Sequence, residues 1–215
     1  MLRKGYVETQ IEALARALAK ILLRKNEGDY NAAITDIRLA GQKMTGFDPT
    51  VLAALADEAL VDLFWFNKQF DAAKCYMAGY LLAEQAESYE GLRRTHLAKI
   101  SLRKARILLM EALVHEETLR KADVIERIDA LEKIIEDEVE TPAELRRRFL
   151  YFEAIGNFGR SEDSLFEFRT PNDPEWRKEA ERFYSRLLEM RDPDLIRGGL
   201  PREEVLAGLE EIRNG

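Results

Sequence analysis

The sequence predicts an all-α protein in which antiparallel helix pairs stack as a right-handed solenoid of about 8–10 helices, with no sheet. Two observations predict this fold class. Residues Asp48, Thr141 and Asp173 each place an N-cap side chain directly before a proline at the first helical position. In addition, we find no alternating apolar and polar run bounded by turn residues, which is the pattern that predicts a strand.

Apolar residues at steps of three and four predict the first helices, over residues 6–25, 30–43, 51–66 and 70–88. The stretch 51–66 reads VLAALADEALVDLFWF and is the most apolar of them. Because its last four residues are all large and apolar, we expect this stretch to be the most buried part of the fold. The turn Asn67–Gln69 then leads into the fourth helix.

The same periodicity continues to the end of the chain and predicts helices over residues 90–118, 120–138, 141–156, 161–168, 175–190 and 202–212. The helix that starts at Thr141 also carries a capping box, because Glu144 is spaced to reach back to the Thr141 N–H. The last helix is short, and we expect it to fray.

The length of 215 residues fits one domain over residues 1–215, with a possible subdivision into 1–88 and 89–215. A net charge of −7 argues against general nucleic-acid binding, which needs clustered lysine and arginine. The single cysteine, Cys75, cannot form an internal disulfide and is expected to be a buried apolar residue. These features place the protein in the cytoplasm.

The N-terminal segment is not expected to be a signal peptide, because Glu8 and Glu12 interrupt its apolar residues. No window approaches 18 uncharged apolar residues, so no membrane span is expected. The first helix is instead expected to pack against the rest of the fold.

Two segments align without gaps at an offset of 40 residues. GDYNAAITDIRLA begins at Gly28 and KQFDAAKCYMAGY begins at Lys68, so that Ala33 aligns with Ala73. A third segment from Gly159 places Ser164 at the same position. This spacing of small and apolar residues resembles the second half of a tetratricopeptide repeat (TPR). In that repeat, a small residue lets one helix pack closely on the next. The spacing of 40 differs from the TPR spacing of about 34.

The whole chain also resembles a bacterial family of uncharacterised TPR-like proteins. The resemblance rests on YVETQIEALARALAKILLRKNEGDYNAAI near the start and FEAIGNFGRSEDSLFEF toward the end, with serine replacing alanine at Ser161 and Ser164. It implies a TPR-like fold and assigns no activity.

No combination of residues typical of catalysis or metal binding is found. His96 and His115 lack partners at metal-ligand spacing, and both are interpreted as ordinary helix-surface residues. The many neighbouring carboxylates are interpreted as solvated helix faces. The sequence therefore predicts a protein that is not an enzyme and that uses no metal or cofactor.

Residues 91–110 contain six basic residues and no acid, whereas residues 111–140 contain eleven acids. Lys99, Arg103 and Arg106 share one helix face. One interpretation is that the basic helix lies beside the acidic one and the two neutralise each other. The alternative is that the three basic residues line a groove for an acidic peptide or carboxylate, to which Arg146–Arg148 would add.

Two functions follow as hypotheses. The leading one is a non-enzymatic TPR-like protein that binds another protein or a peptide, or a second copy of itself as a homodimer. The alternative is a helical ligand-binding or regulatory domain with an interhelical pocket near Trp65, Phe66 and Tyr76. Neither hypothesis involves nucleic acid or a membrane.

Overall fold

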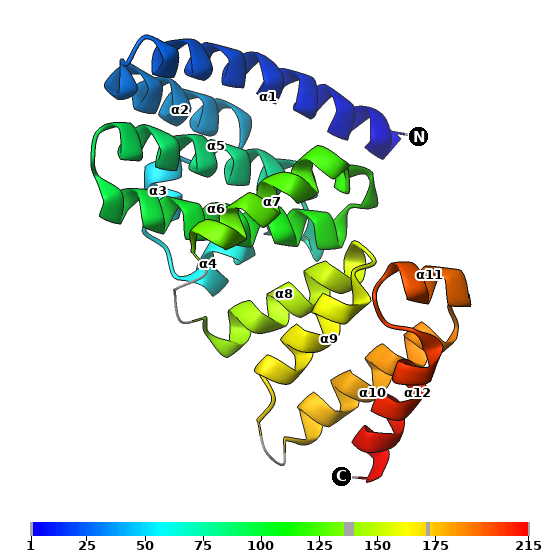
Figure 1. Cartoon of the computed structure of the whole chain (residues 1–215). Helices are drawn as coiled ribbons and strands as arrows, with labels where there is room; N and C mark the ends of the chain where they lie inside the picture. Colours follow the sequence, from blue (N-terminus) through cyan, green and yellow to red (C-terminus); the bar gives the residue numbers. More distant parts are fainter. Residues whose placement is uncertain (1, 136–139, 171–172, 215) are drawn as a thin grey trace. The chain divides into compact units, whose positions relative to one another are not determined.

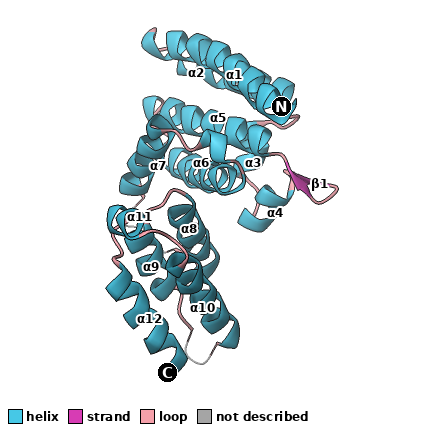
Figure 2. Cartoon of the chain, turned by 90° about the vertical axis from the view of Figure 1, so that its right-hand side faces the viewer, coloured by secondary structure: helices cyan, strands magenta, loops and turns pink. Residues whose placement is uncertain are grey.

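The computed structural model describes residues 2–135, 140–170 and 173–214, and helices dominate these ranges (Figures 1 and 2). The first elements are α1 (Leu2–Asn26), α2 (Tyr30–Met44), α3 (Pro49–Ala53), α4 (Asp57–Asp62), β1 (Trp65–Phe66), β2 (Gln69–Phe70), α5 (Ala72–Gly91), α6 (Thr95–His115), the 3-10 turn η1 (Glu117–Leu119) and α7 (Ala122–Ile134). They are followed by α8 (Pro142–Ala154), α9 (Phe158–Glu167), α10 (Pro174–Leu188), α11 (Asp192–Arg197) and α12 (Arg202–Asn214). The described residues thus form twelve α-helices, more than the predicted eight to ten, because several are short.

The chain divides into two compact units, residues 1–138 and 139–215, which we call the N-terminal and C-terminal units. The subdivision considered after residue 88 falls inside α5. Since α5 packs along the length of α6, those two helices belong to one unit.

The N-terminal unit is built from helices that pack in chain order. Helix α1 packs on α2, α2 on α5 and α5 on α6, and Figure 1 shows these four helices as successive layers. Ala33 of α2 and Ala73 of α5, the two aligned alanines, are both buried, and so are the aligned Ile37 and Met77. Small side chains at these positions therefore do lie in the packed interior between helices.

Helix α5 is the most enclosed element of this unit, with 16 of its 20 residues buried. One reason is Gly79 of α5. A Cβ added to this residue would lie only 2.8 Å from Cγ of Leu109 on α6. Because glycine has no side chain, α5 and α6 can approach each other closely at this point. Cys75 is buried here as expected, and its thiol donates to the carbonyl oxygen of Leu108 at 3.2 Å.

The stretch 51–66 differs from its prediction as a single buried helix. It forms part of α3, then α4, and ends in a two-stranded antiparallel hairpin in which Trp65 pairs with Phe70 and Phe66 with Gln69 (Figure 2). The prediction of no sheet is therefore wrong for this short segment. The burial prediction is wrong at the same place, since Trp65 is 43% and Phe66 76% exposed.

The C-terminal unit packs α8 on α9 and α10 on α12. The Thr141–Glu144 capping box predicted for α8 is present: each residue accepts the other's backbone N–H. The core is rich in aromatic residues and contains Phe149, Phe158, Leu165, Trp176, Ala180, Phe183, Tyr184, Leu187, Leu195, Leu200, Val205, Leu209 and Ile212. Ser161 and Ser164, the small residues of the third aligned segment, are also fully buried.

Across the described ranges, every helix is too short or too polar to cross a membrane.

Candidate functional site

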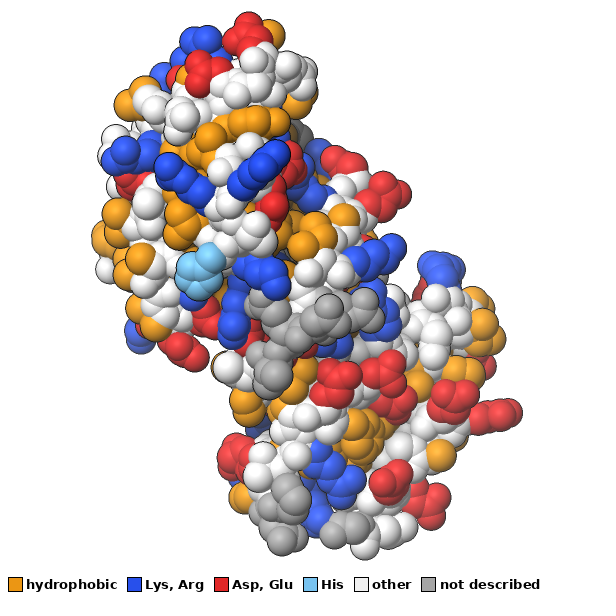
Figure 3. Space-filling model, turned by 60° about the vertical axis from the view of Figure 1, so that its left-hand side comes forward, with side chains coloured by type: hydrophobic (Ala, Val, Ile, Leu, Met, Phe, Trp, Pro, Cys, Tyr) orange, Lys and Arg blue, Asp and Glu red, His pale blue; other side chains and the backbone are white. Residues whose placement is uncertain are grey.

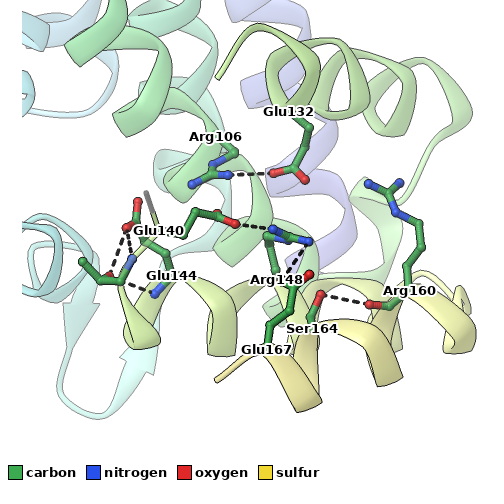
Figure 4. A network of polar contacts seen from close by, with 9 residues as sticks. Arg106, Glu132, Glu140, Glu144, Arg148, Arg160, Ser164 and Glu167 are labelled. Atoms are coloured by element: carbon green, nitrogen blue, oxygen red, sulfur yellow. Dashed lines mark hydrogen bonds and ion pairs between the residues drawn. The ribbon is translucent and has the colours of Figure 1, made fainter. Parts of the chain in front are cut away.

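The three basic residues singled out from the sequence all lie on α6, in different surroundings. Lys99 is exposed, and Arg103 is half-buried with its guanidinium 3.9 Å from a carboxylate oxygen of Asp57. Arg106 is buried and donates from Nη1 to Oε1 of Glu132 on α7 at 2.9 Å (Figure 4). The Arg106–Glu132 pair is the contact expected if the basic and acidic helices neutralise each other.

The basic residues of α8 also form ion pairs. Arg146 forms a two-pronged pair with Glu179, at 2.9 and 2.8 Å. Arg148 pairs with Glu140 and lies 3.4 Å from Glu167, as Figure 4 shows. These contacts fix the arginines to carboxylates of the same unit.

Acidic residues gather around a cavity of about 740 Å³ in the C-terminal unit, which we call the acidic cavity. Its lining includes the rings of Phe166 and Tyr184 and five carboxylates, those of Glu162, Asp163, Glu167, Glu204 and Glu211. Figure 3 shows a face of this unit on which several acidic side chains and a group of basic ones lie beside an apolar patch.

Helical spacing brings these side chains to the cavity. On α9, Glu162 and Phe166 are four residues apart, as are Asp163 and Glu167, so both pairs lie along one side of the helix. Asn157 caps the start of this helix, because its side chain accepts a hydrogen bond from the Arg160 N–H. On α12, Glu204 and Glu211 are separated by two turns and therefore project in the same direction.

Gly208 explains how an aromatic ring reaches the cavity. Glycine inside a helix is unfavourable by about 1 kcal/mol relative to alanine, so its presence in α12 needs a reason. A Cβ at Gly208 would lie 2.4 Å from the Tyr184 ring of α10. The missing side chain thus provides the space in which Tyr184 packs against α12. Its hydroxyl donates to Oε1 of Glu162 at 2.6 Å.

Within the described part of the chain, most of the charges around the cavity have no ion-pair partner. Glu167 lies near Arg148, but Glu162, Asp163, Glu204 and Glu211 form no ion pair with any described lysine or arginine. Burial raises the pKa of Glu162, and the carboxylates of Asp163, Glu204 and Glu211 raise it further, against the lowering effect of the Tyr184 hydrogen bond. Burial and this bond to Glu162 also raise the pKa of Tyr184, so its hydroxyl stays a donor.

The raised pKa of Glu162 predicts a pH dependence of stability. Between the ordinary carboxyl pKa of 4.5 and the raised value, the native state binds the proton more tightly than the unfolded chain, so stability falls as pH rises through this window. In the variant Glu162→Gln, the glutamine side chain cannot ionise, but it can still accept the hydrogen bond from the Tyr184 hydroxyl. We expect E162Q to be more stable than wild type at pH 7, by less than about 1 kcal/mol because solvent screens a half-buried group.

Urea unfolding between pH 4 and 8 measures this effect. Glu203→Gln, which removes an exposed charge from the same unit outside the cavity lining, is the control and should follow the wild-type pH profile. A profile for E162Q that runs parallel to wild type at every pH would contradict the assignment.

A second cavity lies at the β1–β2 hairpin of the N-terminal unit, where the sequence suggested an interhelical pocket near Trp65, Phe66 and Tyr76. Trp65 and Phe66 do line a cavity of about 630 Å³. Tyr76 does not line it: it is buried in α5, where its ring contacts Tyr80 at a centroid distance of 4.7 Å. His115, an exposed residue at the C-terminal end of α6, lines this cavity, and its ring lies against those of Trp65 and Phe70.

Sequence reasoning missed the acidic cavity because it interpreted neighbouring carboxylates as solvated faces. The available signal was the repeated acid spacing on α9 together with Gly208 between two glutamates of α12. No group of three or more His, Cys, Asp or Glu within the described ranges is arranged to hold a metal ion.

Comparison with curated proteins found no match, and comparison with solved structures found none. A scan against protein families matches residues 1–215 to DUF6483, which is described as a family of unknown function. The expectation of an uncharacterised family is confirmed. Because the match spans the whole chain, this protein belongs to the family of unknown function DUF6483.

Proposed function

We propose that this protein is a non-enzymatic, TPR-like helical protein that binds another protein, and that the acidic cavity holds a basic segment of that partner. The observation that carries the proposal is the set of four carboxylates, those of Glu162, Asp163, Glu204 and Glu211, that share one cavity without a cationic partner among the described residues.

The carboxylates of Asp163, Glu204 and Glu211 are exposed around this open cavity, and their negative charges contribute to the raised pKa of Glu162. A lysine or arginine that enters the cavity balances these charges. The ring of Phe166 adds a surface on which a cation or the methylene stem of a basic side chain packs. The charge of the lining therefore favours a basic occupant.

The TPR-like part of the proposal is supported by the N-terminal unit. Its main helices pack in chain order from α1 through α2 and α5 to α6, and the aligned alanines Ala33 and Ala73 lie buried between them. Stacked helices of this kind form extended surfaces that commonly bind other proteins.

The test compares two double variants with the same change in net charge. Glu204→Gln with Glu211→Gln removes two carboxylates of the cavity, whereas Glu203→Gln with Glu210→Gln removes two exposed carboxylates of α12 outside its lining. Binding of a fluorescent peptide of alternating lysine and alanine to the full chain is measured by anisotropy. We expect the cavity variant to raise Kd about 5–30-fold, since each exposed charge pair contributes up to about 1 kcal/mol.

We expect the control variant to change Kd less than about twofold, because distant charges are screened. Binding should weaken with added salt, and a glutamate–alanine peptide should not bind. Equal losses in the two variants would show that only net charge matters, and absence of binding to any basic peptide would overturn the proposal.

A further inference from the structure

Two adjacent arginines form the turn that joins α5 to α6. The N–H of Arg93 donates to the Glu90 carbonyl oxygen at 2.8 Å. The N–H of Arg94 donates to the Tyr89 carbonyl oxygen at the same distance, and the two bonds close the end of α5. Arg93 has a φ of 58°, in the left-handed region, where helix ends usually place glycine. An arginine costs stability there relative to glycine, so the turn itself does not explain why the residue is an arginine.

The side chains of Arg93 and Arg94 are both exposed, and we call this pair the basic turn. Residues 91–110 contain no acid, and Lys99, further along α6, is exposed as well. Within the ranges that the structure describes, neither arginine forms an ion pair, even with the exposed Glu90 one turn earlier. The basic turn therefore carries positive charge that the described fold does not balance by a direct contact.

The neighbouring carboxylates at this end of the N-terminal unit have other partners. A Cβ at Gly91 would lie 2.4 Å from the Tyr30 ring, so the turn between α1 and α2 adjoins the basic turn (Figure 1). In that turn, Glu27 lies 3.6 Å from the guanidinium of Arg24. Asp29 caps α2, because its side chain accepts a backbone N–H of the first helical turn.

The acidic cavity of the C-terminal unit offers the opposite charge. The carboxylates of Asp163, Glu204 and Glu211 are exposed there and form no ion pair with any described lysine or arginine. Glu204 and Glu211 lie two turns apart on α12, a separation of about 10 Å along the helix axis that two long arginine side chains can span. The half-buried ring of Phe166 adds a surface on which a guanidinium can lie.

We propose that this protein self-associates head to tail, with the basic turn of one copy docked in the acidic cavity of a second copy. The inference rests on the proposed function, because it names a second copy of this chain as the partner that supplies the basic segment. Because two different surfaces meet, the contact is heterologous, and association either closes into a ring or continues as a chain.

Sedimentation equilibrium of the full chain, over about a hundredfold range of protein concentration, measures the association. At about 50 mM salt, we expect the weight-average mass to rise above that of a single chain as the concentration increases. At about 1 M salt, where charges are strongly screened, the mass should stay near that of a single chain. A single-chain mass at every concentration in low salt would overturn the proposal.

Two charge-reversal variants test which surfaces meet. Arg93→Glu with Arg94→Glu makes the basic turn acidic, and Glu204→Lys with Glu211→Lys makes the cavity basic. Each variant alone is expected to associate at least about 10-fold more weakly than wild type, because two attractive charge pairs become repulsive. An equimolar mixture of the two should restore association, since each reversed surface then meets its complement on the other variant. Restored association also shows that both variants are folded.

The matched control is Arg16→Glu with Lys43→Glu, two exposed residues of which Lys43 lies at the end of α2 opposite Tyr30. It changes the net charge as the basic-turn variant does, and it should alter association less than about twofold. Glu204→Lys with Glu211→Lys lowers the magnitude of the net charge of −7, so an effect of net charge alone would strengthen its association. Equal losses in the control and basic-turn variants, or a mixture no stronger than its components, would overturn the proposal.

The lysine–alanine peptide separates this inference from the proposed function. If the peptide binds the acidic cavity while the chain stays monomeric in low salt, the proposed function stands and the self-association is wrong. If the chain associates as proposed, excess peptide should dissociate it, because both occupy the same cavity. Association that persists when the peptide saturates the cavity would show that the copies meet elsewhere.

Discussion

Truncation of Phe183 to alanine is expected to destabilise the C-terminal unit by about 3–5 kcal/mol, the range for removing a large side chain from a packed core. Phe183 is completely buried in α10. Its ring meets Phe149 of α8 nearly edge to face, with centroids 5.3 Å apart, and lies at the same distance from Tyr184. A unit of this size is stable by roughly 4–12 kcal/mol, so the loss is a large part of the total.

The two tryptophans make this prediction measurable, because Trp176 lies in the C-terminal unit and Trp65 in the N-terminal unit. Urea unfolding of the full chain is followed by fluorescence, with circular dichroism as a second probe. Phe66→Ala is the control: the same chemical change at an exposed site should alter stability by less than about 0.5 kcal/mol. A loss below about 1 kcal/mol for F183A would contradict the packing described for this core.

Local chemistry allowed most helices to be predicted. Asp48, Thr141 and Asp173 cap α3, α8 and α10 as expected, because an N-cap oxygen and a following proline act within one turn of the helix. Ala33 and Ala73, which align in the two similar segments, are both buried, as expected for small residues between packed helices. The aligned Ala40 is only half-buried, so the two segments do not pack in the same way along their full length.

The hairpin was not predicted, for an identifiable reason. A short apolar run such as that of Leu63–Phe66 is compatible with either a helix or a strand, and the turn that decides between them lacks the usual glycine. Asn67 and Lys68 adopt left-handed backbone angles without it. Since the run was assigned to a helix, its aromatic residues were assigned to the core.

The acid spacing on α9 and Gly208 in α12 are visible in the sequence, but the acidic cavity itself depends on contacts between residues far apart in the chain. Tyr184 of α10 reaches Glu162 of α9 only because Gly208 of α12 leaves room for its ring. The separate helices show acids at helical spacing, which is also the pattern of an ordinary solvated surface. Only packing determines which of these surfaces encloses a cavity.

A shared carboxylate connects three helices of the N-terminal unit. Glu84 of α5 is buried and accepts from Lys25 of α1 at 2.5 Å and from Arg127 of α7 at 2.7 Å. Arg127 also lies over the Tyr80 ring, with its guanidinium carbon 4.8 Å from the ring centroid. Burial lowers the pKa of Lys25, but the hydrogen bonds to Glu84 and Glu87 outweigh this effect and hold its pKa above the ordinary value.

Glu84→Gln is therefore expected to destabilise the N-terminal unit by about 2–4 kcal/mol, because it leaves two cations without the buried charge that balances them. Glu87 contacts the same two cations, but its side chain is 55% exposed, so Glu87→Gln should cost less than about 1 kcal/mol.

Urea unfolding followed by tryptophan fluorescence and circular dichroism compares the two glutamine variants, and a third variant tests the cause. If the unpaired charge is what destabilises E84Q, adding Lys25→Met should restore part of the lost stability. The gap between wild type and E84Q should also narrow as pH rises above 10.5 through the raised pKa of Lys25, where that cation loses its proton. Equal losses for E84Q and E87Q would show that the buried charge of Glu84 contributes no more than the exposed charge of Glu87. A further loss on adding Lys25→Met would show that an unpaired Lys25 is not what destabilises E84Q.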